Sequence, residues 1–231
     1  MKIAPIILFL MAFLMSCNSQ GKYYSPIGIA DKTDEFKELD QWTALESKIS
    51  IDDYTRVGDS IFCGEISCNI GPMEGVDAST FKVWAGSQYA KDKNKVYYPI
   101  EIPCIDYTDC GVCFCGKYTV ERANPETFTY LGKDYATDGI HVYYRGILIG
   151  GADGSTFEVI DGPEEFFFAR DSRNVYVHNR LFKEADPTTF HYDKNDSRNI
   201  HRDFDPRLII GDKSKEWMFT PPYTIEEVKK E

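Results

Sequence analysis

Apolar and polar residues alternate in short runs along most of the chain, and two patterns recur. The first is a small residue, Asp or Asn, two further residues and Thr-Phe, and its copies end at Phe81, Phe128, Phe157 and Phe190. The second is an aromatic residue, Ala, any residue, Asp, three residues, then Val-Tyr, and its clear copies begin at Tyr89, Tyr135 and Phe168. Coinciding patterns at related spacings predict tandem modules of about 30 residues with one longer insertion.

Two further copies are less regular. We interpret Asp196–His201 as a degenerate fourth copy of the second pattern. Ala30-Asp31, followed by Phe36 and Tyr54, is interpreted as a worn copy that precedes the others.

Each module is predicted to be a small antiparallel β-unit. The Asp or Asn of the first pattern favours an Asx-type turn, because its side chain accepts backbone N–H groups. Thr-Phe, the aromatic-Ala segment and Val-Tyr predict strands, with hairpin loops such as Asp92–Lys95 between them. In that loop we expect Asn94 to adopt positive φ, a freedom that Gly139 supplies in the second module. Isolated hairpins are marginal in water, so the modules should stack or share a sheet.

The predicted fold class is therefore all-β, with tandem antiparallel hairpin or meander repeats. Apolar residues lie three apart within Asp34–Lys48, namely Phe36, Leu39, Trp42 and Leu45, which is compatible with a short N-terminal helix. A strand register is the alternative for this segment. The expected segments are a signal peptide over 1–16, a tether over 17–27, an N-terminal region with the worn copy over 28–75, the repeat region over 76–205 with a Cys-rich insertion near 104–116, and a C-terminal segment and tail over 206–231.

The N-terminus indicates export. Lys2 is followed by the uncharged run Ile3–Met15, which is shorter than the about 20 apolar residues of a spanning helix and typical of a signal peptide. Leu14–Cys17 resembles the lipobox of bacterial lipoproteins. The resemblance implies cleavage before Cys17 and lipid attachment to its thiol. In some lipoproteins an aspartate after the cysteine retains the protein in the inner membrane. This chain has Asn18 there, so the resemblance favours the outer membrane over the inner membrane. The alternative is an ordinary secretory signal with an accidental cysteine.

The composition of the chain limits the kinds of partner that it can bind. The 231 residues are 42% hydrophobic and 14% aromatic, which is enough for a folded core. The net charge of −11 argues against nucleic acid, whose phosphates require a basic face. We expect contact with membrane lipid through the N-terminal anchor, and an envelope protein or glycan as the ligand.

The remaining cysteines indicate disulfides, because an even number in an exported chain favours pairing. The candidates are Cys63, Cys68, Cys104, Cys110, Cys113 and Cys115. Their connectivity stays open. Two alternatives are a thiol-redox site at Cys110–Cys113, which has C-x-x-C spacing but no strand–helix context, and a four-cysteine zinc site, which lacks a second C-x-x-C. We predict no metal and no cofactor.

Recurrent tyrosines offer a second candidate site. They are Tyr97, Tyr98, Tyr143, Tyr144 and Tyr176. Core and cross-strand packing is the favoured interpretation. However, adjacent strand residues face opposite ways, so one tyrosine of each pair is expected outside. A row of outward tyrosines would form a binding stripe for a glycan or a partner protein.

The second pattern carries a family resemblance. Asp92–Tyr98 resembles the motif of the DKNYY family of bacterial repeat proteins. The second copy keeps Asp138 with Tyr143-Tyr144, and the third keeps Asp171 and Tyr176. The resemblance covers roughly residues 76–205 and implies a repeat fold, without an assigned activity or site.

No nucleophile elbow, phosphate-binding loop or dinucleotide fingerprint occurs, and we predict no catalytic residue. We therefore expect an exported, lipid-anchored β-repeat protein of the cell envelope with a binding or structural role. The alternative is a hydrolase or thiol-redox enzyme acting on envelope material. An enzyme would require a pocket where unlike polar residues from different modules converge.

Overall fold

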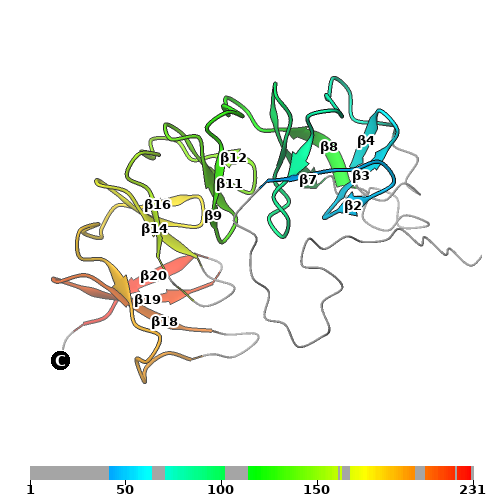
Figure 1. Ribbon diagram of the computed structural model, residues 1–231. Helices are drawn as coiled ribbons and strands as arrows, with labels where there is room; N and C mark the ends of the chain where they lie inside the picture. Colours follow the sequence, from blue (N-terminus) through cyan, green and yellow to red (C-terminus); the bar gives the residue numbers. More distant parts are fainter. Residues whose placement is uncertain are drawn as a thin grey trace, which may run out of the picture.

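The computed structural model describes residues 42–63, 71–101, 114–160, 162, 167–200, 206–221 and 223–229. These residues form strands and turns, with no helix among them, and the strands build small antiparallel sheets. The all-β prediction is confirmed. Figure 1 shows the sheets following one another along an arc in the order of the sequence. Within this part of the chain, no helix is long and apolar enough to cross a membrane.

The strands of the described residues belong to five sheets. The N-terminal sheet contains β2 (Ser50–Ile51), β3 (Tyr54–Val57) and β4 (Ser60–Cys63). Repeat 1 contains β1 (Thr43–Ala44), β5 (Lys82–Val83), β6 (Ala90–Lys91), β7 (Val96–Glu101) and β8 (Phe114–Thr119). Repeat 2 contains β9 (Thr129–Gly132), β10 (Tyr135–Thr137), β11 (Val142–Tyr144) and β12 (Ile147–Leu148). Repeat 3 contains β13 (Glu158–Ile160), β14 (Phe168–Arg170), β15 (Val175–Val177) and β16 (Arg180–Phe182). Repeat 4 contains β17 (His191–Tyr192), β18 (Leu208–Gly211), β19 (Glu216–Thr220) and β20 (Thr224–Glu227).

Neighbouring sheets bury their faces against one another. Side chains alternate along a strand, so in repeat 3 Ala169 and Tyr176 pack toward repeat 2, whereas Phe168, Val175 and Val177 pack toward repeat 4. The backward-facing pairs of the four repeats are Ala90 with Tyr97, Ala136 with Tyr143, Ala169 with Tyr176, and Ile210 with Trp217. The forward-facing sets of the first three repeats are Tyr89, Val96 and Tyr98; Tyr135, Val142 and Tyr144; and Phe168, Val175 and Val177. Each repeat thus completes its core only with its neighbours.

This alternation overturns the expected outward tyrosines. Tyr98 and Tyr144 are only 5% and 8% exposed, and Tyr97, Tyr143 and Tyr176 are buried as well. In each of the two tyrosine pairs, one ring packs against the preceding sheet and the other against the following sheet. Both faces of the strand are covered, so these tyrosines are core residues and do not form a binding stripe.

The helix expected within Asp34–Lys48 is not formed in the described residues of that segment, which begin at Trp42. β1 instead pairs antiparallel with β5. Leu45 is fully buried, and the Trp42 ring meets Trp84 edge-on at 5.3 Å. Sheet pairing and aromatic packing therefore prevail over the three-residue spacing of apolar residues.

The fourth repeat extends past the boundary expected at residue 205. β17 pairs with β18, and the β19–β20 hairpin completes the sheet as far as Glu227. The expected C-terminal segment is thus an integral part of the repeat array. The pattern was missed because residues 193–207 separate β17 from β18, and because Trp217 stands where the other repeats have the motif tyrosine.

Candidate functional site

The motif carboxylate of each repeat holds together the hairpin that follows it. Asp171 Oδ1 accepts hydrogen bonds from the amides of Arg173 and Asn174 at 2.7 and 2.8 Å. Its Oδ2 accepts from the Asp153 amide at 3.0 Å and from the Tyr176 hydroxyl at 2.7 Å. A carboxylate has about four acceptor positions, and the fold itself occupies them.

The same arrangement recurs in the other repeats. Asp92, Asp138 and Asp212 each accept two amides of their own hairpin and the amide of the Asp or Asn that opens the repeat. Tyr97 and Tyr143 repeat the hydroxyl contact at 2.8 and 3.4 Å. These contacts identify Asp212 as the fourth motif aspartate, so the assignment of Asp196–His201 to that copy was wrong.

The environment favours the charged form of Asp171 and of Asp212. Burial by itself raises the pKa of Asp171, but the Tyr176 hydroxyl and the surrounding amides outweigh it and leave the pKa lowered. At Asp212 burial is likewise outweighed by the amide of Asp186 and by Ser214, and the pKa falls to about 2. Asp171 and Asp212 are therefore structural acceptors, poorly suited to proton transfer at neutral pH.

The predicted Asx-type turns are present. In repeat 3, Asp153 Oδ1 accepts from the Ser155 amide at 3.0 Å, and the Thr156 amide donates to the Asp153 carbonyl at 3.2 Å. Thr156 Oγ1 in turn accepts from the Ser172 amide at 3.1 Å. Equivalent side-chain contacts open the other repeats. The Thr of Thr-Phe thus ties the opening turn to the carboxylate hairpin.

In repeat 1, the backbone of the Asp92–Lys95 hairpin differs from the positive φ expected at Asn94. Asn94 does not adopt positive φ, whereas Gly139 does, at 88°. The amides of Asn94 and Lys95 point at Asp92 Oδ1, at 2.7 and 2.8 Å. These two bonds close the loop with φ at Asn94 in its ordinary range.

At the end of the sheets away from the carboxylate hairpins, tyrosine hydroxyls join repeat 1 to turns of repeat 2, and repeat 2 to a turn of repeat 3. Tyr89 Oη donates to the Asp134 carbonyl at 3.2 Å and accepts from the Gly146 amide at 2.9 Å. Tyr135 Oη donates to the His178 carbonyl at 2.7 Å. The turns at this end are therefore fixed by the preceding repeat.

A cation–aromatic patch lies at this end of repeats 2, 3 and 4. Its members are Lys133, Tyr144, Arg145, Phe167, His178, Arg180 and Tyr223. The His178 ring stacks on Tyr144 with centroids 5.5 Å apart, and it meets Phe167 and Tyr223 edge-on at 5.9 and 5.5 Å. His178 Nδ1 also lies 3.2 Å from the Tyr223 hydroxyl. Four rings from three repeats thus form one continuous aromatic cluster.

Each cation of the patch lies over one of these rings. The distances to the ring centroids are 5.4 Å for Lys133 over Phe167, 5.5 Å for Arg145 over Tyr144 and 3.7 Å for Arg180 over Tyr223. Cation–π contacts of this kind contribute about 0.5–1 kcal/mol at exposed sites. Arg145 is also paired with Asp134 at 2.8 Å. The patch therefore gathers three cations, one of them paired with a carboxylate, in a chain whose net charge is −11.

A polar groove of about 220 Å³ lies between repeats 3 and 4. It is lined by Thr156, Glu158, Arg170, Asp171, Ser172, Pro187 and Thr188. Arg170 donates to Glu158 at 3.0 Å and to the Pro187 carbonyl at 3.1 Å. Because Asp171 is also committed to its hairpin, the charged groups that line this groove are occupied by contacts within the fold.

The predicted cysteine sites fall mainly outside the described residues, as Cys17, Cys68, Cys104, Cys110 and Cys113 do. Cys63 is buried, at 6% exposed, in the core between the N-terminal sheet and repeat 1, and Cys115 lies in β8. In the part of the chain that the structure describes, no group of three or more His, Cys, Asp or Glu residues could hold a metal ion.

Residues 107–180 match the DKNYY family. The matched DKNYY segment spans repeat 2 and most of repeat 3, and it includes the pairs Asp138–Tyr143 and Asp171–Tyr176. The aspartate and tyrosine of the DKNYY motif are therefore the two partners that hold the hairpin in this chain. Searches of curated proteins and of solved structures found no match.

Sequence reasoning did not identify the cation–aromatic patch. Its residues come from three repeats, and all of them except Tyr144 lie outside the DKNYY motif. The sequence does hold one signal for the patch, at the position directly after β11 and β15, the strands that carry the motif tyrosines. Arg145 and His178 occupy this position in repeats 2 and 3, and both adopt positive φ, 49° and 53°. Side chains at such turns project from the end of the sheet, beyond the packed faces.

Proposed function

We propose that this chain is an exported, lipid-anchored β-repeat protein of the cell envelope that binds an acidic glycan through the cation–aromatic patch. The observation that carries the proposal is the patch itself, in which three cations lie over three of the four rings that three consecutive repeats contribute.

Charge complementarity favours an acidic ligand. The chain as a whole is strongly negative, so it repels an acidic polymer except where positive charge is concentrated. Lys133, Arg145 and Arg180 concentrate it here, and guanidinium and ammonium groups form charge-assisted hydrogen bonds with carboxylates. Half-buried His178 and Tyr223 provide aromatic edges between the cations for contact with sugar rings.

Preorganisation favours binding as well. The turn that carries His178 is fixed by the Tyr135 hydroxyl, and the Asp134 and Arg145 turns hydrogen bond to each other at 3.1 Å. A ligand therefore meets positioned side chains and loses less free energy to ordering them. The hydrolase or redox alternative has no comparable observation in its favour, because the charged groups of the groove are already engaged.

The ligand is tested with the full-length protein in detergent, using polygalacturonate as the acidic glycan, dextran as the neutral one and polyglutamate as an acidic peptide. We expect binding to polygalacturonate that weakens with salt, and at least about tenfold weaker binding for Lys133→Gln/Arg180→Gln. Lys183→Gln, an exposed lysine just beyond β16, is the control and should bind normally. Equal binding to dextran, or tighter binding to polyglutamate, contradicts the glycan assignment.

The anchor is tested separately. Cys17→Ser should abolish metabolic labelling with palmitate and release the protein from membranes, because the acyl chains supply about 0.8 kcal/mol per buried methylene. On fractionation, the wild-type protein should accompany the outer membrane where the source has one. An unlabelled Cys17→Ser protein that stays on membranes contradicts the lipoprotein proposal.

A further inference from the structure

The forward face of repeat 4 differs from those of the earlier repeats. Leu208 and Ile210 pack toward repeat 3, so Ile209 between them faces the other way, where a fifth repeat would stack. By the same alternation, Glu216 and Met218 flank inward-facing Trp217 and face forward. The matching positions of repeat 3 are Phe168, Val175 and Val177, which are all buried.

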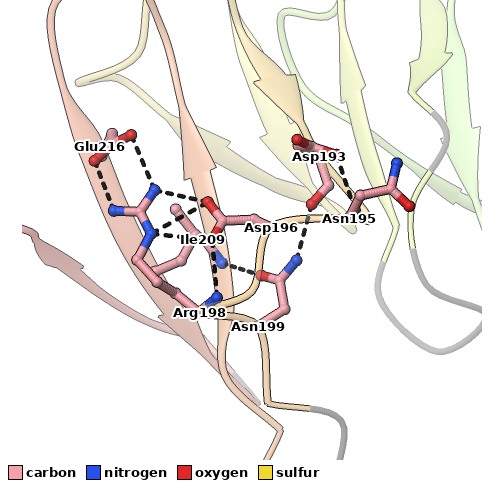
Figure 2. A network of polar contacts seen from close by, with 7 residues as sticks. All are labelled: Asp193, Asn195, Asp196, Arg198, Asn199, Ile209 and Glu216. Carbon is pink, nitrogen blue, oxygen red and sulfur yellow. Dashed lines mark hydrogen bonds and ion pairs between the residues drawn. The ribbon is translucent and has the colours of Figure 1, made fainter.

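On this forward face, Ile209 is only 6% exposed. Residues 193–200 lie beside it, in the segment that links β17 to β18 (Figure 2). Asn199 Oδ1 accepts from the Ile209 amide at 2.8 Å, and Asn199 Nδ2 donates to the Asp193 carbonyl at 2.8 Å. Ile200 and Arg207 form an antiparallel bridge with hydrogen bonds of 2.8 and 2.9 Å.

Arg198 fastens this segment to the sheet. Its guanidinium donates to both carboxylate oxygens of Glu216, at 2.9 and 3.1 Å. It also donates to Asp196, at distances from 2.6 to 3.2 Å. Figure 2 shows the guanidinium between the two carboxylates. Bidentate pairs are the strong, geometrically specific form of this contact, so the polar segment is held in one position over the forward face.

We infer that residues 193–200 form a cap that covers the forward face of repeat 4 and prevents a second copy of this chain from stacking on it. The terminal repeat of a stacked array exposes an apolar face that is prone to association, unless a polar element covers it. Without the cap, Ile209 and Met218 of two copies would meet about a two-fold axis, the commonest symmetry of dimers. The cap lies outside the cation–aromatic patch, so the inference stands independently of the proposed glycan site.

The test uses full-length protein in detergent. Arg198→Ala/Asn199→Ala removes the side chains that fasten the cap, whereas Lys194→Ala/Asn195→Ala changes the same segment without touching those contacts. Sedimentation velocity should show monomers for the wild type and the control, and an about twofold higher protein mass for the uncapped variant. Hydrogen exchange of the Ile209 amide should accelerate at least about tenfold in the uncapped variant alone.

Glu216→Lys gives a second route, because it leaves the cap sequence intact and places a like charge against Arg198. If the double variant fails to fold, the mass of Glu216→Lys decides. A folded uncapped variant that remains monomeric overturns the inference, as does a wild-type protein that already dimerises through this face. Glycan binding should be unchanged in all of these variants, which separates failure of the cap from failure of the proposed function.

Discussion

The Tyr176 hydroxyl donates a 2.7 Å hydrogen bond to Oδ2 of Asp171, five residues earlier in the chain. Both groups are buried, and the same carboxylate closes the hairpin between them. The ring of Tyr176 packs toward repeat 2. One tyrosine therefore serves the core through its ring and the turn through its hydroxyl, which explains why these two residue types recur together.

Tyr176→Phe should destabilise the protein by about 1–3 kcal/mol, because it leaves a buried carboxylate oxygen with one partner fewer. Urea denaturation followed by circular dichroism measures the change. Tyr192→Phe is the matched control, since the Tyr192 hydroxyl makes no hydrogen bond to the described residues and its side chain is only half-buried. Equal losses for both variants would show that the hydroxyl contact is unimportant.

Acid should destabilise the fold between about pH 4 and pH 2. The pKa of Asp212 is lowered from 3.8 to about 2 on folding, so its contribution is complete above pH 3.8 and is lost as the pH falls through the folded value. Asp138 and Asp171 are lowered in the same direction. We expect the urea midpoint to drop across this range.

Asp212→Asn should reduce that drop, although it also lowers stability at pH 7 because a charged acceptor is lost. Asp59→Asn, at an exposed turn, should leave the acid response unchanged. A variant at Asp212 with the full wild-type acid response would contradict the role assigned to this carboxylate.

Gly154→Ala should destabilise the contact between repeats 2 and 3. A Cβ at this position would lie 2.6 Å from Thr137 Oγ1 and 2.9 Å from the Ile140 carbonyl carbon. Overpacking of this kind costs about 1–3 kcal/mol. Gly150→Ala is the control, because nothing lies within 4 Å of the point that its new Cβ would occupy. Thermal denaturation should separate the two variants, and a harmless Gly154→Ala would show that the turns can move apart freely.

The six cysteines other than Cys17 should be oxidised in protein purified from an oxidising compartment. Denaturation without reductant should then expose no free thiol, apart from Cys17 if it is unlipidated. Reduction should lower stability by about 2–4 kcal/mol for each closed loop. Six reactive thiols with one equivalent of zinc would instead support the four-cysteine zinc alternative.

Much of the fold follows from local chemistry. The turn at Asp153 and the hairpin at Asp171 can be predicted from the sequence. In both, the aspartate side chain accepts amides only two or three residues further along the chain. The repeat of about 30 residues is equally visible along the chain. A local rule failed at Asn94, where two amide bonds to one carboxylate made positive φ unnecessary.

The tertiary structure alone decided what covers each face. Alternation in a strand predicts that Tyr143 and Tyr144 point in opposite directions, but whether a direction leads to solvent depends on stacking, and here both lead into cores. Asp212 is identified as the fourth motif aspartate by its hydrogen bond from the Asp186 amide. This contact joins residues on either side of the long segment between β17 and β18. The cation–aromatic patch arises in the same way, because it joins residues of three repeats that come together only when the sheets stack.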